Sequence, residues 1–128
     1  MPSHTIHSYK ELIVWQRAIE LVIAVYKLTA LFPKEEQYVL TSQMRRAAIS
    51  IPSNIAEGRR RGSRQDYLRF LRIAYASGAE LETQVEIARH LPMTKSHDYT
   101  SVDAPLEEVM KMLNVLIRTL NPNHKTTT

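Results

Sequence analysis

Residues 63–91 of the chain read SRQDYLRFLRIAYASGAELETQVEIARHL. Apolar and small side chains recur in this stretch at steps of three and four residues, which is the spacing of one face of an α-helix. Ser63 with Asp66 forms a capping-box pattern, and Leu91-Pro92 ends the segment. The residues predicted to share the packed face are Tyr67, Phe70, Leu71, Ala74, Gly78, Leu81, Val85 and Ala88. The stretch therefore predicts one long amphipathic helix.

Two further helices are predicted near the ends of the chain. One runs from about Tyr9 to Leu31 and stops at Phe32-Pro33, because the residue before a proline is pushed out of the helical region. Its predicted buried stripe is Leu12, Trp15, Ile19, Val22 and Tyr26, widened by Ile13, Ile23 and Val25. The other is predicted from an N-cap at Asp103 to Leu120, with Pro105 in its first turn.

The remaining helix is predicted from about Glu35 to Glu57, with a kink at Pro52 and Gly58 as its terminator. Opposite its apolar stripe runs a polar line of Gln43, Arg46, Ser50, Asn54 and Glu57. Such a line suits either phosphate recognition or a polar contact between subunits. Four amphipathic helices with short links favour an all-α fold, an antiparallel up-down-up-down four-helix bundle. We expect one domain over 1–128, with its core in about 9–120 between a flexible N-terminal arm and a flexible C-terminal tail.

The positive charge of the chain is concentrated in one window. The net charge of the chain is +4. Residues 45–72 contain eight arginines, no lysine and two carboxylates, a net charge of +6, so the remaining residues together carry −2. The planar fork of arginine binds phosphate in a bidentate manner, so the window suggests phosphate contacts; the alternative is a solvated helix boundary around a basic joint at Arg59–Gly62. The candidate residues for binding nucleic acid or a partner are Arg45, Arg46, Ser50, Asn54, Arg59, Arg60, Arg61 and Arg64.

No catalytic centre is recognisable in the sequence. The absence of cysteine excludes disulfides, thiolate catalysis and cysteine-held metals. Glu86 and His90 could share a helix face, as a metal pair or as a solvated pair, and Glu80, Glu82 and Glu86 fit an acidic solvated or inter-subunit face better than paired catalytic carboxylates. We expect no enzymatic activity, no cofactor and no metal site; a bundle enzyme with a metal in its core is the remaining alternative.

The sequence also carries no pattern for a membrane. No apolar run reaches the roughly 18–20 residues that a membrane span requires, and the N-terminal residues MPSHTIHSYK lack the apolar region of a signal peptide. We therefore expect a cytoplasmic protein with no membrane partner.

Two long segments resemble a known family. Residues 43–58, QMRRAAISIPSNIAEG, and residues 70–84, FLRIAYASGAELETQ, are similar to the four-helix proteins encoded in intervening sequences of bacterial 23S ribosomal RNA genes. The resemblance extends over about Tyr9 to Leu120. One departure lies at Ala76-Ser77-Gly78, where family members often carry a Gly-Ser pair.

The resemblance implies a four-helix protomer that assembles into a homo-oligomeric ring, with a pentamer favoured. It also implies a fold like that of the accessory protein of diversity-generating retroelements, a basic pentamer that binds a reverse transcriptase and nucleic acid. Fold alone is a weak guide to activity. The leading hypothesis is a non-enzymatic protein that binds RNA or another nucleic acid through its arginines. The alternative is a scaffold or accessory subunit that docks an acidic or nucleic-acid-processing protein partner.

Overall fold

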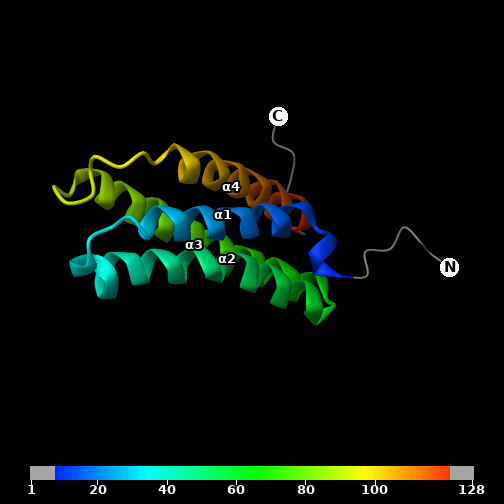
Figure 1. The fold of residues 1–128 in the computed structure, drawn as a ribbon. Coiled ribbons are helices and arrows are strands. Elements are labelled where there is room, and N and C mark those ends of the chain that lie inside the picture. The colour runs from blue at the N-terminus through cyan, green and yellow to red at the C-terminus, as the bar shows by residue number, and fades with distance from the viewer. Residues whose placement is uncertain (1–7, 122–128) are drawn as a thin grey trace, which may run out of the picture.

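The computed structural model describes residues 8–121, and this part of the chain contains helices and no strand. Its four α-helices are α1 (Ile13–Thr29), α2 (Ser42–Arg61), α3 (Arg64–His90) and α4 (Thr100–Leu120). Figure 1 shows the α1–α2 and α3–α4 connections at one end of the molecule and the short α2–α3 turn at the other. The all-α class with four helices is confirmed. The predicted flexible arm and tail fall mostly on residues 1–7 and 122–128, which lie outside the described residues.

The core is a single cluster to which all four helices contribute. Helix α2 packs most extensively on α3, while α1 lies against both α2 and α4, and α3 also contacts α4. The large side chains that are fully buried include Leu21, Met44, Ile51, Ile55, Leu71, Leu81 and Leu113. Each such side chain stabilises the fold by about 1.5–3 kcal/mol relative to an exposed position, so these contacts dominate the packing.

Helix α3 agrees with the sequence analysis in its bounds, its cap and its buried face. The Ser63 side chain accepts a hydrogen bond from the Asp66 backbone N–H at 3.0 Å, which starts the helix as predicted. Ala74, Gly78 and Leu81 lie in the core as expected. Tyr67 is only half-buried, at the edge of the same face.

The predicted buried stripe of α1 is wrong by about one position around the helix. The residues that enter the core are Val14, Ala18, Leu21, Val25 and Leu28. The predicted residues Leu12, Trp15, Ile19 and Val22 are half-buried beside the core, and Tyr26 is exposed. Of the three residues predicted to widen the stripe, Val25 is buried as expected, whereas Ile13 and Ile23 are exposed. Apolar side chains surround most of this helix, so the positions of α2 and α4 decide which of them are buried.

The predicted end of the second helix is also wrong. Helix α2 continues through Gly58 to Arg61, and Gly62 ends it in the left-handed conformation with φ 86°. Gly58 is instead a contact point, since a Cβ there would lie 2.6 Å from Phe70 Cβ. The segment predicted to begin this helix forms a 3-10 turn at Lys34–Glu36 and a π-helical turn at Gln37–Thr41. Pro52 is buried inside α2, and the helix runs on past it.

Helix α4 begins at Thr100, three residues before the predicted N-cap at Asp103. The Thr100 backbone N–H donates to Asp98 Oδ1 at 3.0 Å, so a carboxylate lies near the positive end of the helix. The Asp103 carboxylate instead accepts a hydrogen bond from Arg89 and ties α4 to the end of α3. The residues Asp103 and Pro105 therefore predicted a helix start in the right region, but three residues after the first residue of α4.

Candidate functional site

The eight candidate residues do not form one continuous site within the protomer. Helix α2 rises about 1.5 Å per residue, so Arg45 and Arg60 are separated by about 22 Å along it. Arg45 and Arg46 lie near the α1–α2 connection, Ser50 and Asn54 in the middle, and the others at the α2–α3 turn. These three places have different surroundings.

Arg45 closes the end of α1. Its Nε donates to Thr29 Oγ1 at 2.9 Å, an NH2 group donates to the Tyr26 carbonyl oxygen at 3.3 Å, and the guanidinium lies 4.3 Å from the centre of the Tyr26 ring. The Tyr26 carbonyl oxygen also accepts from the Ala30 backbone N–H at 3.0 Å, so Arg45 adds a second, charged donor to the last turn of α1. Arg45 thus makes two side-chain hydrogen bonds to α1 within the protomer. Its neighbour Arg46 is exposed.

Ser50 links α2 to α3, and Asn54 holds the Ser50 side chain from within α2. Asn54 Nδ2 donates to the Ser50 carbonyl oxygen at 2.8 Å and to Ser50 Oγ at 2.9 Å, and Ser50 Oγ lies 2.8 Å from Ser77 Oγ. Because Ser50 Oγ accepts from the amide, its own proton is available to Ser77. Both side chains are half-buried. The middle of the predicted polar line therefore contacts a neighbouring helix of the same chain.

Arg59, Arg60 and Arg61 form the last turn of α2 rather than a joint between helices. Each guanidinium lies over an aromatic ring: Arg59 at 5.8 Å from the centre of Tyr67, Arg60 at 5.6 Å from Tyr9 and Arg61 at 4.9 Å from Phe70. Stacking on a ring stabilises the cation and fixes its plane. Three cations also suit the negative end of a helix dipole.

The neighbours of these arginines differ in charge. Arg61 NH2 lies 2.9 Å from Glu57 Oε2, so this side chain is paired with a carboxylate at the surface. Burial raises the pKa of Tyr67, and the positive charge of Arg59 opposes that rise. In the described part of the chain, neither Arg59 nor Arg60 forms an ion pair with a carboxylate.

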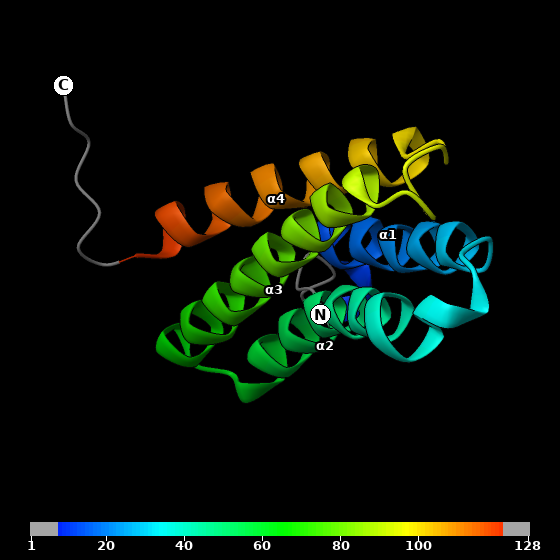
Figure 2. The same cartoon turned by 90° about the vertical axis from the view of Figure 1, so that its left-hand side faces the viewer.

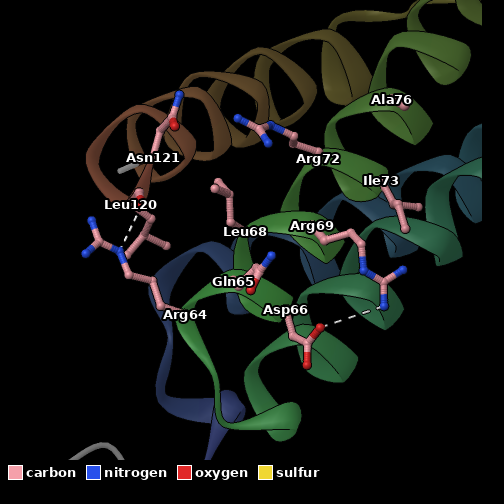
Figure 3. Close-up of a pocket in the computed structure, with 10 residues that line it drawn as sticks. All are labelled: Arg64, Gln65, Asp66, Leu68, Arg69, Arg72, Ile73, Ala76, Leu120 and Asn121. Carbon is pink, nitrogen blue, oxygen red and sulfur yellow. Dashed lines mark hydrogen bonds and ion pairs between the residues drawn. The ribbon is translucent and has the colours of Figure 1, made fainter. Parts of the chain in front are cut away.

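A cleft of about 1100 Å³ opens between the first half of α3 and the end of α4. The two helices diverge toward this end of the molecule (Figure 2), and Figure 3 shows the side chains that line the cleft. Arg64 Nε donates to the Leu120 carbonyl oxygen at 2.8 Å, and Arg69 NH2 lies 3.9 Å from Asp66 Oδ1. The lining residues are Arg64, Gln65, Asp66, Leu68, Arg69, Arg72, Ile73, Ala76, Leu120 and Asn121.

Sequence reasoning did not select Arg69 or Arg72 as candidate site residues, although both were counted in the charged window. A signal was present, since Arg69 and Arg72 are three residues apart and are therefore neighbours on the surface of the predicted helix. The part of the cleft that α4 forms could not be predicted from local sequence, because Leu120 lies 56 residues from Arg64. The cleft combines three exposed arginines with an apolar floor that includes Leu68.

The glutamate and histidine pair is solvated. His90 Nδ1 lies 2.8 Å from the Glu86 carbonyl oxygen and 3.6 Å from Glu86 Oε2, and both residues are exposed. A carbonyl oxygen can only accept, so the Nδ1 atom carries the proton in this contact. Within residues 8–121, no three carboxylate or imidazole groups come together as metal ligands. Over the same residues, no helix is long and apolar enough to cross a membrane.

Comparison with known proteins gives a consistent assignment. No curated protein matches the chain. A similar solved structure is the crystal structure of a protein of unknown function from the S23 ribosomal protein family of Bacteroides thetaiotaomicron, with a TM-score of 0.71 and 25% sequence identity. The match covers 82% of this chain and 98% of that one. The family model described as 23S rRNA-intervening sequence protein matches residues 10–115, and the chain therefore belongs to this family.

Proposed function

We propose that this chain is a non-enzymatic cytoplasmic protein that binds RNA through the arginines at the α2–α3 end of an antiparallel up-down-up-down bundle. The observation that carries the proposal is the concentration of six arginines in the last turn of α2 and the first part of α3. Arg59, Arg60 and Arg61 lie on the last turn of α2, and Arg64, Arg69 and Arg72 follow on α3. The family name, which refers to a ribosomal RNA gene, favours RNA as the nucleic acid.

The charge balance at this end supports an anionic ligand. Residues 57–72 contain six arginines against Glu57 and Asp66, a net charge of +4, and contain no lysine. Arg59 and Arg60 lie over aromatic rings and form no ion pair within the described residues, so their N–H edges stay free for bidentate contacts with phosphate. With the coefficient of about 0.9 per contact that holds for a DNA duplex, six phosphate contacts would give a logarithmic salt slope of about −5, so affinity should fall by about a thousandfold between roughly 50 and 200 mM salt.

Fluorescence anisotropy with a structured RNA, measured over a salt series, tests the proposal. The variant Arg59→Glu/Arg60→Glu/Arg61→Glu should abolish binding and flatten the salt dependence. A matched control is Lys27→Glu/Lys34→Glu/Lys95→Glu, which changes the net charge equally at exposed positions near the opposite end of the bundle. This control should retain most of the affinity. Equal losses in both variants, or no binding at low salt, would refute an RNA site at the α2–α3 end.

We also propose that the protein acts as a homo-oligomer, with the pentameric ring implied by the family resemblance. Support comes from an apolar groove of about 400 Å³ between α1 and α4. Ile13 and Val115 in this groove are 55% and 60% exposed in the protomer. Large exposed apolar groups that lie together are typical of interaction surfaces. Sedimentation velocity should report an oligomer that Val115→Glu dissociates, and a monomeric wild-type chain would contradict the proposal.

A protein partner is the alternative occupant of the arginine end. An acidic protein surface would satisfy the same cations, because carboxylates also fit the arginine fork. Recovery of a stoichiometric protein with the tagged chain after nuclease treatment would favour this function. The triple arginine variant should then lose that partner and not an RNA.

A further inference from the structure

A groove runs along the α1–α2 side of the same end, away from the α3–α4 cleft. Two adjoining hollows share Tyr9 and Ala56 and together form it. The outer hollow, of about 580 Å³, is lined by Tyr9, Ala56, Glu57, Arg60 and Arg61. The inner one, of about 300 Å³, has a lining that includes Tyr9, Trp15, Ile19, Pro52 and Ala56. The groove thus has a cationic mouth and an aromatic and apolar interior.

The aromatic rings in the groove are held in place but are not fully covered. Tyr9 and Trp15 meet edge to face, with ring centres 5.4 Å apart and planes at 62°, and both side chains are half-buried. The 3-10 turn that carries Tyr9 is fixed by Gln16 Nε2, which donates to the Lys10 carbonyl oxygen at 2.8 Å. Arg60 covers Tyr9 from the mouth of the groove. An edge-to-face pair leaves ring surface without a stacking partner.

The charge at the mouth selects the kind of occupant. Glu57 is engaged by Arg61 at 2.9 Å, and within the described residues Arg60 contacts a ring and no carboxylate. The mouth therefore carries an unbalanced positive charge beside an apolar interior. The complementary ligand is one that joins an anionic group to a flat apolar group through a short link, as a nucleotide does.

We propose that this groove binds an unpaired base of single-stranded RNA, with the adjacent phosphate on Arg60. The inference rests on the proposed RNA function and narrows it to RNA that contains unpaired nucleotides. Bases within a duplex are stacked and cannot enter a groove, whereas splayed bases stack on aromatic rings and on guanidinium planes. The base lies against Trp15 and Tyr9, and Pro52 and Ala56 on α2 form the opposite wall.

Trp15 is the one tryptophan of the chain, so its emission reports on the groove directly. The probes are a mixed-sequence single-stranded RNA, the same strand annealed to its complement, and an abasic strand of equal length. Anisotropy measures binding to the whole protein, and Trp15 emission measures entry of a base. We expect the single strand to quench Trp15 at saturation, and the duplex and the abasic strand to bind without quenching it.

Substitution of Tyr9 separates this groove from the remainder of the arginine end. Tyr9→Leu should weaken single-strand binding by about tenfold or more, because base–aromatic stacking contributes on that scale. It should weaken duplex binding much less, because it removes the ring beneath Arg60 but not the charge of Arg60. Tyr9→Phe should restore affinity. Tyr75→Leu is the matched control, since Tyr75 is an exposed tyrosine of α3 outside the groove. Circular dichroism should give the same helix content for all three variants.

The outcomes distinguish this inference from the proposed function. RNA binding by anisotropy with no Trp15 response, or equal quenching by abasic RNA, would overturn the base site and leave RNA binding standing. Absence of any RNA binding would overturn both. A change in Trp15 emission on dilution without RNA would assign the groove to a second copy of the chain and overturn the base site.

Discussion

Replacing Gly58 with alanine should destabilise the protein, although alanine is normally the better residue inside a helix. The added Cβ would lie 2.6 Å from Phe70 Cβ and 3.3 Å from the Tyr67 carbonyl oxygen. Both atoms are fixed to the backbone of α3 and cannot rotate away. Helices α2 and α3 would have to separate by about 0.8 Å to restore an ordinary 3.4 Å contact. This happens in the most extensive helix pair of the bundle.

The expected magnitude follows from two opposing effects at Gly58. Alanine gains about 1 kcal/mol in helix propensity over glycine. Overpacking a well-packed core costs about 1–3 kcal/mol, and a contact with fixed atoms belongs at the upper end of that range. The net loss in the free energy of unfolding is therefore about 2 kcal/mol. In a domain of this size that loss lowers Tm by roughly 8 °C.

Urea denaturation followed by circular dichroism measures this loss, and Gly78→Ala is the matched control. A Cβ at Gly78 would meet Met110 Sδ, the flexible end of a side chain that can rotate aside. We expect Gly78→Ala to stay within about 1 kcal/mol of the wild type, because propensity then offsets most of the repacking. One protein concentration must be used throughout, since self-association would shift the midpoint. A Gly58→Ala variant as stable as the wild type, or a more damaging Gly78→Ala, would refute this reasoning.

Three further predictions concern the helix ends. Ser63→Ala removes the N-cap of α3 and should lower the free energy of unfolding, measured by urea denaturation, by about 1 kcal/mol. Ser63→Asp should keep the wild-type free energy of unfolding, because aspartate is also a good N-cap. Arg45→Met should cost about 1–2 kcal/mol, because Thr29 Oγ1 and a carbonyl of α1 lose a charged donor, and it should leave RNA affinity unchanged by anisotropy. Hydrogen bonds from Thr100 lower the pKa of Asp98 below its ordinary value of 3.8. The Asp98 carboxylate therefore stabilises the native state at neutral pH and loses this effect as pH falls through its lowered pKa. The difference in Tm between wild type and Asp98→Ala should shrink below about pH 3.8, and a constant difference would contradict the assignment.

Local sequence signals were sufficient for much of the helical structure. The Ser63 cap and Leu91-Pro92 mark the ends of α3 through side-chain capping and backbone geometry, which depend on only a few neighbouring residues. Phe32-Pro33 marks the end of α1 less closely, since the helix stops at Thr29 rather than at the predicted Leu31. The buried face of α3 was also readable, because its apolar and charged residues fall on different sides. Arginine content and the family motif at residues 43–58 were evident without any structure.

Tertiary structure alone decided the features that depend on a neighbouring helix. Apolar residues surround α1, so only the placement of α2 and α4 selects Val14 over Trp15 for the core. Gly58 looks like a terminator in sequence, but close approach of α3 makes it a packing residue, and Gly62 ends the helix. The candidate arginines are divided in the same way: contact with the end of α1 engages Arg45, whereas the α2–α3 turn gathers Arg59 to Arg72. Sequence thus determined the helices and their charge, and packing between helices determined which side chains stay available to a ligand.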